Sequence, residues 1–197
     1  PLDQFFSIGY IEALPSKVEF TPQSDRYDAY RRIFGNAQQE AMQKLNYFLI
    51  GAGALGCEML KNWALMGVAT KDNGLVTLTD MDSIERSNLN RQFLFRDKDI
   101  GKMKSVAAAE AVKVMNPEIK IDTHINRVGQ ESEAIYNDKF FTNLSGVCNA
   151  LDNVVTRLYS DQQCVFYKKP MLESGTLGTK AHYQMIVPFL TESYAST

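Results

Sequence analysis

The sequence predicts an α/β fold: a Rossmann-like, open and mostly parallel sheet with helices on both faces. Two patterns carry this prediction. From residue 46 onward, short apolar runs alternate with helical patterns, and a glycine-rich turn at residues 51–56 joins the first apolar run to a helix. Strands that alternate with helices are typical of parallel sheets connected by right-handed crossovers. The composition agrees, because 45% hydrophobic and 22% charged residues are usual for a folded domain.

The elements follow in chain order, after an N-terminal segment at residues 1–45 that we expect to pack on the main domain at residues 46–197. Residues 47–50 are apolar throughout, as in a strand buried on both faces. Asn116 and Pro117 end a helix that begins near residue 102. Further strands are expected at residues 75–79, 120–125, 146–151, 170–172 and 182–187, and helices at residues 37–45, 57–67, 102–115, 131–141 and 154–167.

Charge and hydropathy argue against several classes of protein. The chain has 21 basic and 23 acidic residues and a net charge of −2, whereas nucleic-acid-binding surfaces usually carry a strong basic excess. No apolar run approaches the ~18 residues of a transmembrane helix, and the first residues lack the pattern of a signal peptide. We therefore expect neither nucleic acid nor a membrane as a partner.

Cysteine and histidine usage argues against a structural metal. Cys57, Cys148 and Cys164 form no CxxC pair, so they suit neither a disulfide framework nor a four-cysteine zinc site. We expect that the thiols are reduced and that no zinc is bound. We also expect the side chains of Cys57 and Cys148 to be buried. The isolated His124 and His182 are expected to be structural or exposed.

The glycine turn predicts a nucleotide phosphate site. Gly51, Gly53 and Gly56 have the spacing G-x-G-x-x-G, directly after a strand and at the start of a helix. Glycine permits the tight turn and lets backbone N–H groups approach a phosphate, while the helix N-terminus adds partial positive charge. A purely packing role for the three glycines is the alternative.

Asp80 extends this site to a ribose. It lies 24 residues beyond Gly56 (80 − 56), at the end of the second predicted strand, where a carboxylate can accept hydrogen bonds from ribose hydroxyls. The alternative is that Asp80 only caps the turn at residues 80–83. On these residues alone, an NAD-dependent oxidoreductase is the default interpretation.

The residues after Asp80 fit a triphosphate better than a dinucleotide. A run of amides and one guanidinium at residues 87–92, together with Lys104, matches a more highly charged ligand. Asp82 and Asp152 offer oxygen ligands for Mg²⁺, which is usually held by one or two carboxylates and by substrate phosphates. The alternative is a solvated polar loop, with Asp152 as a helix cap.

The same residues resemble the adenylation domain of ubiquitin-activating enzymes, which implies a ThiF-type adenylation fold. The likeness also implies a reaction in which ATP·Mg and the C-terminal carboxylate of ubiquitin form an acyl-adenylate and pyrophosphate, before a thioester forms on a cysteine outside this chain. The family continues beyond residue 197, so the main domain is expected to be truncated on its C-terminal side. The matching runs are GAGALGCE (51–58), TDMDSIE (79–85), SNLNRQFLFR (87–96), NALDN (149–153), LESGTLGTK (172–180) and LTESY (190–194).

The resemblance assigns roles to individual residues. It implies that Arg91, Lys104 and Asp152 are catalytic, with Arg91 and Lys104 on the phosphates. It places Mg²⁺ on Asp152 and Asp82, and the ribose on Asp80. The implied nucleotide-binding set is Gly51, Gly53, Ala54, Gly56, Asp80, Asp82, Asn88, Arg91, Gln92, Lys104, Val128 and Asp152, with Ala54 beside the nucleotide, Asn88 and Gln92 lining the pocket, and Val128 near adenine.

The resemblance also implies partners and a location. The expected partners are ubiquitin, and the inactive adenylation half and catalytic-cysteine domain of the same enzyme. Ubiquitin-conjugating enzymes would bind through the full-length protein, and the location would be the cytoplasm and the nucleus. The inactive half would supply an Arg to the ATP site, so we expect this chain alone to be impaired in turnover. Residues 176–180 are a candidate ubiquitin contact.

A different class of function is an interaction module that self-associates through apolar surface freed from a missing partner. Phe5, Phe6, Ile33 and Phe34 are the candidate residues for that surface, although each suits a core equally well. An NAD-dependent oxidoreductase is a distant third interpretation, because it would leave residues 87–92 and Lys104 without a role.

Overall fold

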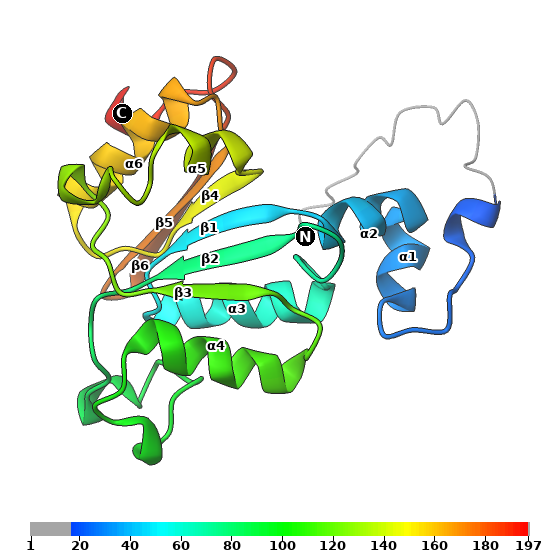
Figure 1. The fold of residues 1–197 in the computed structure, drawn as a ribbon, viewed down its shortest axis with the longest axis horizontal. Helices are drawn as coiled ribbons and strands as arrows, with labels where there is room; N and C mark the ends of the chain where they lie inside the picture. The colour runs from blue at the N-terminus through cyan, green and yellow to red at the C-terminus, as the bar shows by residue number, and fades with distance from the viewer. Residues whose placement is uncertain (1–16, 197) are drawn as a thin grey trace, which may run out of the picture. The chain divides into compact units, whose positions relative to one another are not determined.

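A six-stranded sheet forms the centre of the computed structural model, which describes residues 17–196. Its strand order is β3-β2-β1-β4-β5-β6; the first five of these are parallel, and β6 is antiparallel to β5 (Figure 1). The predicted open and mostly parallel sheet is therefore confirmed. The strands are β1 (Asn46–Ile50), β2 (Leu75–Thr79), β3 (Ile121–His124), β4 (Gly146–Asn149), β5 (Met171–Leu177) and β6 (Lys180–Ile186).

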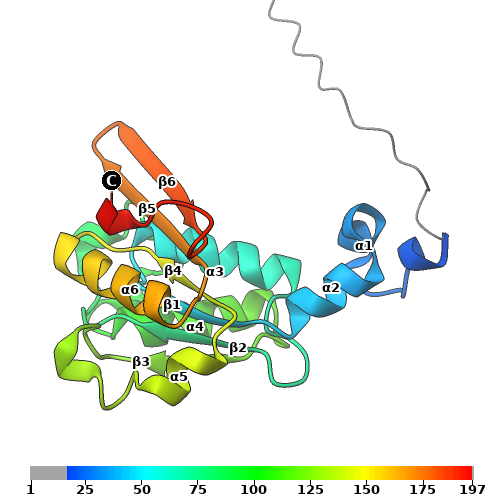
Figure 2. The same cartoon turned by 90° about the horizontal axis from the view of Figure 1, so that it is seen from above.

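Helices cover both faces of this sheet, as predicted (Figures 1 and 2). Neighbouring residues of β1 point to opposite faces. Leu49 therefore packs in one core with Leu60, whereas Phe48 packs in a second core with Phe141. No helix in the described part of the chain is long and apolar enough to cross a membrane. The helices of the first face are α3 (Ala54–Met66) and α4 (Lys104–Met115), and those of the second face are α5 (Asp138–Asn143) and α6 (Val154–Phe166).

The chain divides into two units, Pro1–Glu40 and Ala41–Thr197, and the sheet belongs to the second. The packing of residues 1–45 on the main domain stays a prediction. Phe5 and Phe6 lie outside the described residues. The two helices before the sheet are α1 (Asp28–Phe34), in the first unit, and α2 (Asn36–Gln43), which runs from the first unit into the second.

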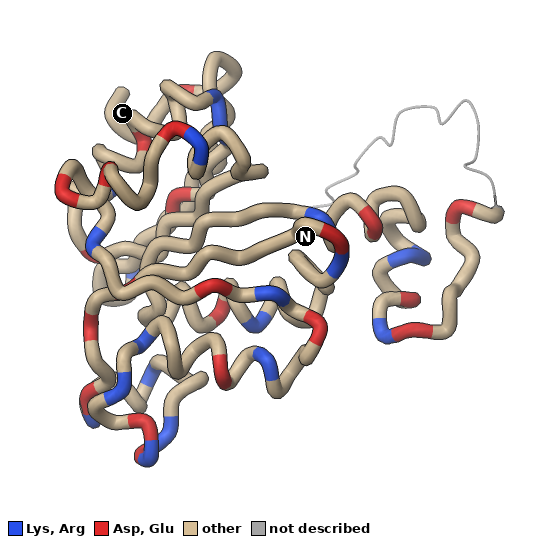
Figure 3. Tube along the Cα trace, viewed as in Figure 1, with Lys and Arg blue, Asp and Glu red and all other residues tan. Residues whose placement is uncertain are grey.

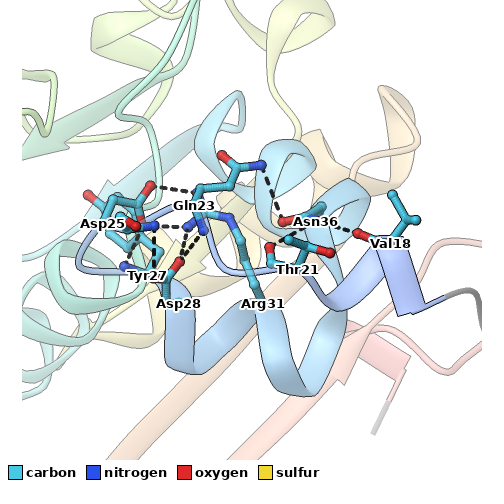
Figure 4. Close-up of polar contacts among 9 residues, drawn as sticks. Val18, Thr21, Gln23, Asp25, Tyr27, Asp28, Arg31 and Asn36 are labelled. Atoms are coloured by element: carbon cyan, nitrogen blue, oxygen red, sulfur yellow. Dashed lines mark hydrogen bonds and ion pairs between the residues drawn. The ribbon is translucent and has the colours of Figure 1, made fainter.

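An ion cluster around one buried arginine organises the described part of the first unit. Arg31 is fully buried, and its guanidinium pairs with the carboxylates of Asp25 and Asp28 (Figure 4). Asp28 also accepts hydrogen bonds from the backbone N–H groups of Gln23 (2.8 Å) and Ser24 (3.0 Å). These contacts fasten the turn at residues 23–25 to the first turn of α1.

The sequence pattern does not predict α1. The helix is short, and it is held by this charge cluster rather than by a periodic apolar face that the sequence would reveal. Two of the candidate self-association residues lie on it. Ile33 is 69% exposed and Phe34 is 51% exposed, so both are surface residues rather than core residues.

Two further predicted elements differ from the structure. The helix expected at residues 131–141 is wrong, since a 3-10 turn occupies Gln130–Ser132 and α5 begins only at Asp138. The Asn137 side chain accepts a hydrogen bond from Phe140 N (3.1 Å) and so fixes the start of the helix. β5 extends well beyond the expected residues 170–172, because it pairs along its whole length, Met171–Leu177, with the antiparallel β6.

Two close backbone approaches shape the glycine turn. Gly51 has φ +103°, and a Cβ there would lie 2.4 Å from Ala150 O. A Cβ at Gly56 would lie 2.1 Å from Gly51 O, so α3 can start against the end of β1 only without a side chain at this position. Gly53 differs, since the nearest atom to its Cβ would be Gln92 Nε2 at 3.8 Å. The packing role therefore holds for Gly51 and Gly56, and Gly53 has room for a side chain.

The three cysteines are free and fully buried, which confirms the expectation for Cys57 and Cys148. Burial raises the pKa of Cys57 to about 11, and that of Cys148 and Cys164 to about 12. A protonated, buried thiol is a poor nucleophile, so none of the three suits a thioester-forming role. Of the histidines, His182 is exposed, and a ring nitrogen of His124 lies 3.2 Å from the Tyr136 hydroxyl.

We expect Gly56→Ala to lower the free energy of unfolding by about 1–3 kcal/mol, because the new methyl group would overlap Gly51 O. Gly53→Ala is the matched control, and it should cost less than about 1 kcal/mol, the scale of a helix N-cap change. Urea unfolding followed by circular dichroism measures both. Equal losses in the two variants would contradict the close packing at Gly56.

We expect iodoacetamide to leave Cys57, Cys148 and Cys164 unmodified at neutral pH in the native protein and to alkylate all three in concentrated urea. Their raised pKa values keep the thiols protonated, and burial blocks access. Peptide mass spectrometry reads each site separately. Rapid native-state alkylation of any one of them would show that its surroundings open at neutral pH.

Candidate functional site

A cleft of about 270 Å³ opens at the carboxyl edge of the sheet, at the ends of β1, β2 and β4. Strand order reverses at β1, so the chain leaves β1 and β4 toward opposite faces, and such switch points are where open α/β sheets bind ligands. Every predicted nucleotide-binding residue except Gly56 lines the cleft: Gly51, Gly53, Ala54, Asp80, Asp82, Asn88, Arg91, Gln92, Lys104, Val128 and Asp152.

The N-terminus of α3 points its backbone amides toward this cleft. Gly53 is the N-cap residue, and no side chain caps the helix. The hydrogen bond from Cys57 N to Gly53 O (2.9 Å) starts the helical ladder, so the amides of residues 54–56 have no partner within the helix. Unpaired amides and the positive end of the helix dipole are suited to a phosphate.

Asp80 joins the glycine turn to the end of β2. Its Oδ2 accepts a hydrogen bond from Ala52 N (2.7 Å), and its Oδ1 accepts one from Asp82 N (2.9 Å). Burial raises the pKa of Asp80, although the two amides oppose this effect. The turn-capping alternative is thus present in the structure. Each carboxylate oxygen can accept a further hydrogen bond, so a ribose contact stays compatible with the cap.

Lys104 brings a buried cation to the cleft. Its Nζ lies 2.8 Å from Asp82 Oδ2, and its side chain is 11% exposed against 56% for Asp82. Lys104 is the first residue of α4, and its backbone N–H donates to Asp82 O (2.9 Å). The predicted phosphate ligand and one predicted Mg²⁺ ligand are therefore ion-paired with each other.

The predicted residues of the loop at 87–92 have different environments. Asn88 is buried, and its Oδ1 accepts a hydrogen bond from Glu85 N (2.9 Å), which makes it part of the loop's own structure. Gln92 is 4% exposed, and its Oε1 has no hydrogen-bond partner within residues 17–196. Arg91 is exposed on the cleft, and its Nη1 donates to Ser87 O (3.0 Å). Gln92 and Arg91 are thus placed to contact a ligand.

Asp152 is exposed and lines the cleft from the turn that follows β4. The helix-cap alternative for Asp152 is wrong, because Asn153 is the N-cap of α6, and its Oδ1 accepts a hydrogen bond from Thr156 N (2.9 Å). Among residues 17–196 there is no group of three or more His, Cys, Asp or Glu side chains that could hold a metal. Mg²⁺ is often held by only one or two carboxylates together with substrate phosphates, and such a site does not need three protein side chains.

Sequence reasoning missed several residues of the cleft. Asn126 and Arg127 line it together with Val128, and Thr156 lines it from the first turn of α6. Residues 126–127 follow β3, whose carboxyl end meets the same edge as β1 and β2, so strand position alone could have indicated them. Thr176, near the end of β5, also lines the cleft, whereas the sequence indicates residues 176–180 only as a candidate ubiquitin contact.

Charges are interspersed by sign along the chain rather than gathered into one basic or acidic stretch (Figure 3). Lys104 and Arg91 therefore act as local cations in a chain with a net charge of −2. They face a cleft that also holds the Asp80, Asp82 and Asp152 carboxylates. This combination can bind a phosphate chain together with a cation.

Curated relatives match the whole chain. It is 56% identical to Ubiquitin-activating enzyme E1 1 of Schizosaccharomyces pombe, 54% identical to Ubiquitin-like modifier-activating enzyme 1 of Dictyostelium discoideum, and 52% identical to Ubiquitin-like modifier-activating enzyme 1 of Homo sapiens. Each match covers 100% of this chain and 19% or 20% of the relative, so the chain spans about a fifth of their length. The resemblance to ubiquitin-activating enzymes is confirmed.

A protein-family comparison agrees with these relatives. The model of the ThiF family matches residues 27–197, a range that contains the sheet and every residue of the cleft. The chain therefore belongs to the ThiF family.

Proposed function

We propose that this chain is the nucleotide-binding part of a ubiquitin-activating enzyme. The reaction is the adenylation of the C-terminal carboxylate of ubiquitin by ATP, followed by thioester formation on a cysteine outside this chain. The observation that carries the proposal is the cleft, where a helix N-terminus, Lys104 and Arg91 meet the carboxylates of Asp80 and Asp152. The names of the relatives, which match over the whole chain, support ubiquitin or a ubiquitin-like protein as the substrate.

The residues of the cleft fit ATP. The unpaired amides at residues 54–56 suit a phosphate, and Asp80 stands where a ribose hydroxyl could donate to it. The unpartnered Oε1 of Gln92 can accept a hydrogen bond from a ligand. Val128, which is buried at the same cleft, offers an apolar surface to the adenine ring.

The chemistry needs orientation and charge neutralisation more than base catalysis. The carboxylate of ubiquitin is already a nucleophile. One of its oxygens forms a bond to the α-phosphorus while the bond from that phosphorus to the bridging oxygen breaks, and pyrophosphate leaves with the electron pair. Arg91, Lys104 and the start of α3 supply positive charge near the transferred group.

Asp152 and Asp82 are the residues that would hold Mg²⁺. When bound, the ion would neutralise phosphate charge. Asp82 is paired with Lys104 at 2.8 Å, whereas Asp152 is exposed, so Asp152 is the stronger of the two candidates. The Lys104–Asp82 pair would then orient the lysine toward the phosphates.

The remaining expectations follow from the same proposal. Ubiquitin, the inactive adenylation half, the catalytic-cysteine domain and ubiquitin-conjugating enzymes are the proposed partners, and the cytoplasm and nucleus the proposed location. The exposed Ile33 and Phe34 favour self-association of the isolated chain as a second, non-catalytic candidate. An NAD-dependent oxidoreductase would leave Arg91 and Lys104 without a role.

We expect calorimetry to show that the protein binds ATP·Mg in preference to NAD, because Lys104 and Arg91 match a triphosphate better than a dinucleotide pyrophosphate. Titrations of both nucleotides into the same preparation make the comparison direct. Tighter binding of NAD would overturn the proposed function.

In the full-length protein, Asp152→Asn should reduce ubiquitin-dependent exchange between ATP and pyrophosphate by about 100-fold, the usual scale for the loss of one electrostatic group in an active site. Asp97→Asn is the matched control, since Asp97 is 77% exposed and pairs only loosely with the exposed Arg86 (3.4 Å). That control should exchange at the wild-type rate. If Asp152→Asn also does so, Asp152 has no part in the reaction.

A further inference from the structure

A buried ion pair lies next to the turn that carries Asp152, because its arginine donates to Leu151 O. Arg157, on α6, pairs with Glu173, on β5, and their side chains are 8% and 0% exposed. Neither side chain lines the cleft, but Thr156 and Asp152, close to Arg157 in sequence, both do. The pair therefore belongs to the layer that supports the site rather than to the site itself.

Stability alone is a weak reason for such a pair. Removing two charges from water is costly, and an apolar pair of similar volume is often as stable or more stable. The contacts that the pair makes with the surrounding backbone therefore explain its presence better than the attraction between its two charges does.

Arg157 holds two stretches of main chain together. Its Nη2 donates to Leu151 O, and its Nη1 donates to Ser174 O (2.9 Å). Leu151 immediately precedes Asp152, and Ser174 belongs to β5. A Cβ at Gly175 would lie 3.0 Å from Nη2, so the chain leaves space for the guanidinium beside β5. The planar fork of an arginine can bridge two acceptors in this way, which a single ammonium does less well.

Glu173 is itself fixed from the other side. Its Oε2 accepts a hydrogen bond from Asn149 Nδ2 (2.7 Å), and the same amide donates to Ser160 Oγ (2.8 Å). Ser174 Oγ donates to Asn149 O (3.0 Å). The network thus joins the end of β4, the middle of α6 and β5.

The turn that carries Asp152 is fastened on both sides of that residue. Before it, Ala150 N donates to Ile50 O (2.8 Å), and Leu151 O accepts from Arg157. After it, Asn153 caps α6. The Asp152 side chain is exposed, so its place in the cleft depends on the backbone that these contacts hold.

We propose that Arg157, oriented by Glu173, is a positioning residue that clamps the 150–153 turn to β5 and so sets the place of the Asp152 carboxylate in the cleft. The effect on the reaction rests on the proposed function. The effect on nucleotide binding does not require ubiquitin chemistry.

The test uses two clamp variants of the full-length protein. Arg157→Met combined with Glu173→Met removes both charges at similar volume, so no buried charge is left unpaired. Arg157→Lys keeps a charge opposite Glu173 but removes the fork. Cys164→Ala is the control, because Cys164 is fully buried on the same helix and packs in the second core rather than on the clamp. Thermal melting checks that all variants are folded at the assay temperature.

We expect both clamp variants to weaken ATP·Mg binding by about 10–100-fold in calorimetry, the usual effect of losing a residue that supports a ligand. Added to Asp152→Asn, the Met pair should weaken binding by less than about threefold more, because both changes remove the same contribution. Cys164→Ala should bind as the wild type does. Wild-type binding in the folded Met pair, or a full multiplication of its effect with that of Asp152→Asn, would overturn the clamp.

The reaction gives a separate reading. At saturating ATP, ubiquitin-dependent exchange of pyrophosphate should fall by about 10–100-fold in the clamp variants and stay unchanged in Cys164→Ala. If the wild type shows no ubiquitin-dependent exchange, the proposed function fails, while the binding comparison still decides the clamp. If the wild type reacts and the clamp variants react equally fast, the clamp has no role in catalysis.

Discussion

The reversal of strand order at β1 is the constraint on which the site depends. β2 lies on one side of β1 and β4 on the other, and their connecting helices cover opposite faces of the sheet (Figure 1). The connections that follow β1 and β4 therefore run to opposite faces of the sheet, and the cleft opens at the carboxyl ends of these two strands. Gly51 allows the two sides to approach closely, because a Cβ at that position would lie 2.4 Å from Ala150 O. Gly51 and Ala150, which both line the cleft, are thus packed closely backbone to backbone.

The electrostatics of the cleft follow from where the elements begin and end. α3 starts without a side-chain cap, which leaves its amides to a ligand, and α4 starts at Lys104, which places a cation on the same edge. Asp80 closes β2 and is held by Ala52 N and Asp82 N. Because these groups sit at the ends of regular elements, the sheet and its helices determine where each of them lies. The net charge of −2 does not indicate this arrangement, since the chemistry of the cleft depends on where individual charged groups lie.

The sequence was sufficient to predict the parts that depend on local pattern. Strand ends, the glycine spacing and the run at residues 87–92 are local, and every nucleotide-binding residue predicted from them except Gly56 lines one cleft. The failures involve contacts that no periodicity reports. Asn137 starts α5 late through a side-chain hydrogen bond, and Asn153 rather than its neighbour Asp152 caps α6. The Arg157–Glu173 pair joins a helix to a strand. Nothing in the sequence around either residue indicates that the two form an ion pair in the folded chain.

Two arginines are buried among residues 17–196, and they suggest one rule for charges in this protein. Arg31 pairs with Asp25 and Asp28, and Asp28 in turn accepts the backbone amides of an irregular turn. Arg157 pairs with Glu173 and donates to the carbonyls of Leu151 and Ser174. In both places an ion cluster around a buried arginine also hydrogen-bonds backbone groups, through Asp28 in the first case and through Arg157 itself in the second. Since an apolar pair could match the stability but could not hold those backbone atoms, the charges are best explained by the loop geometry that they impose.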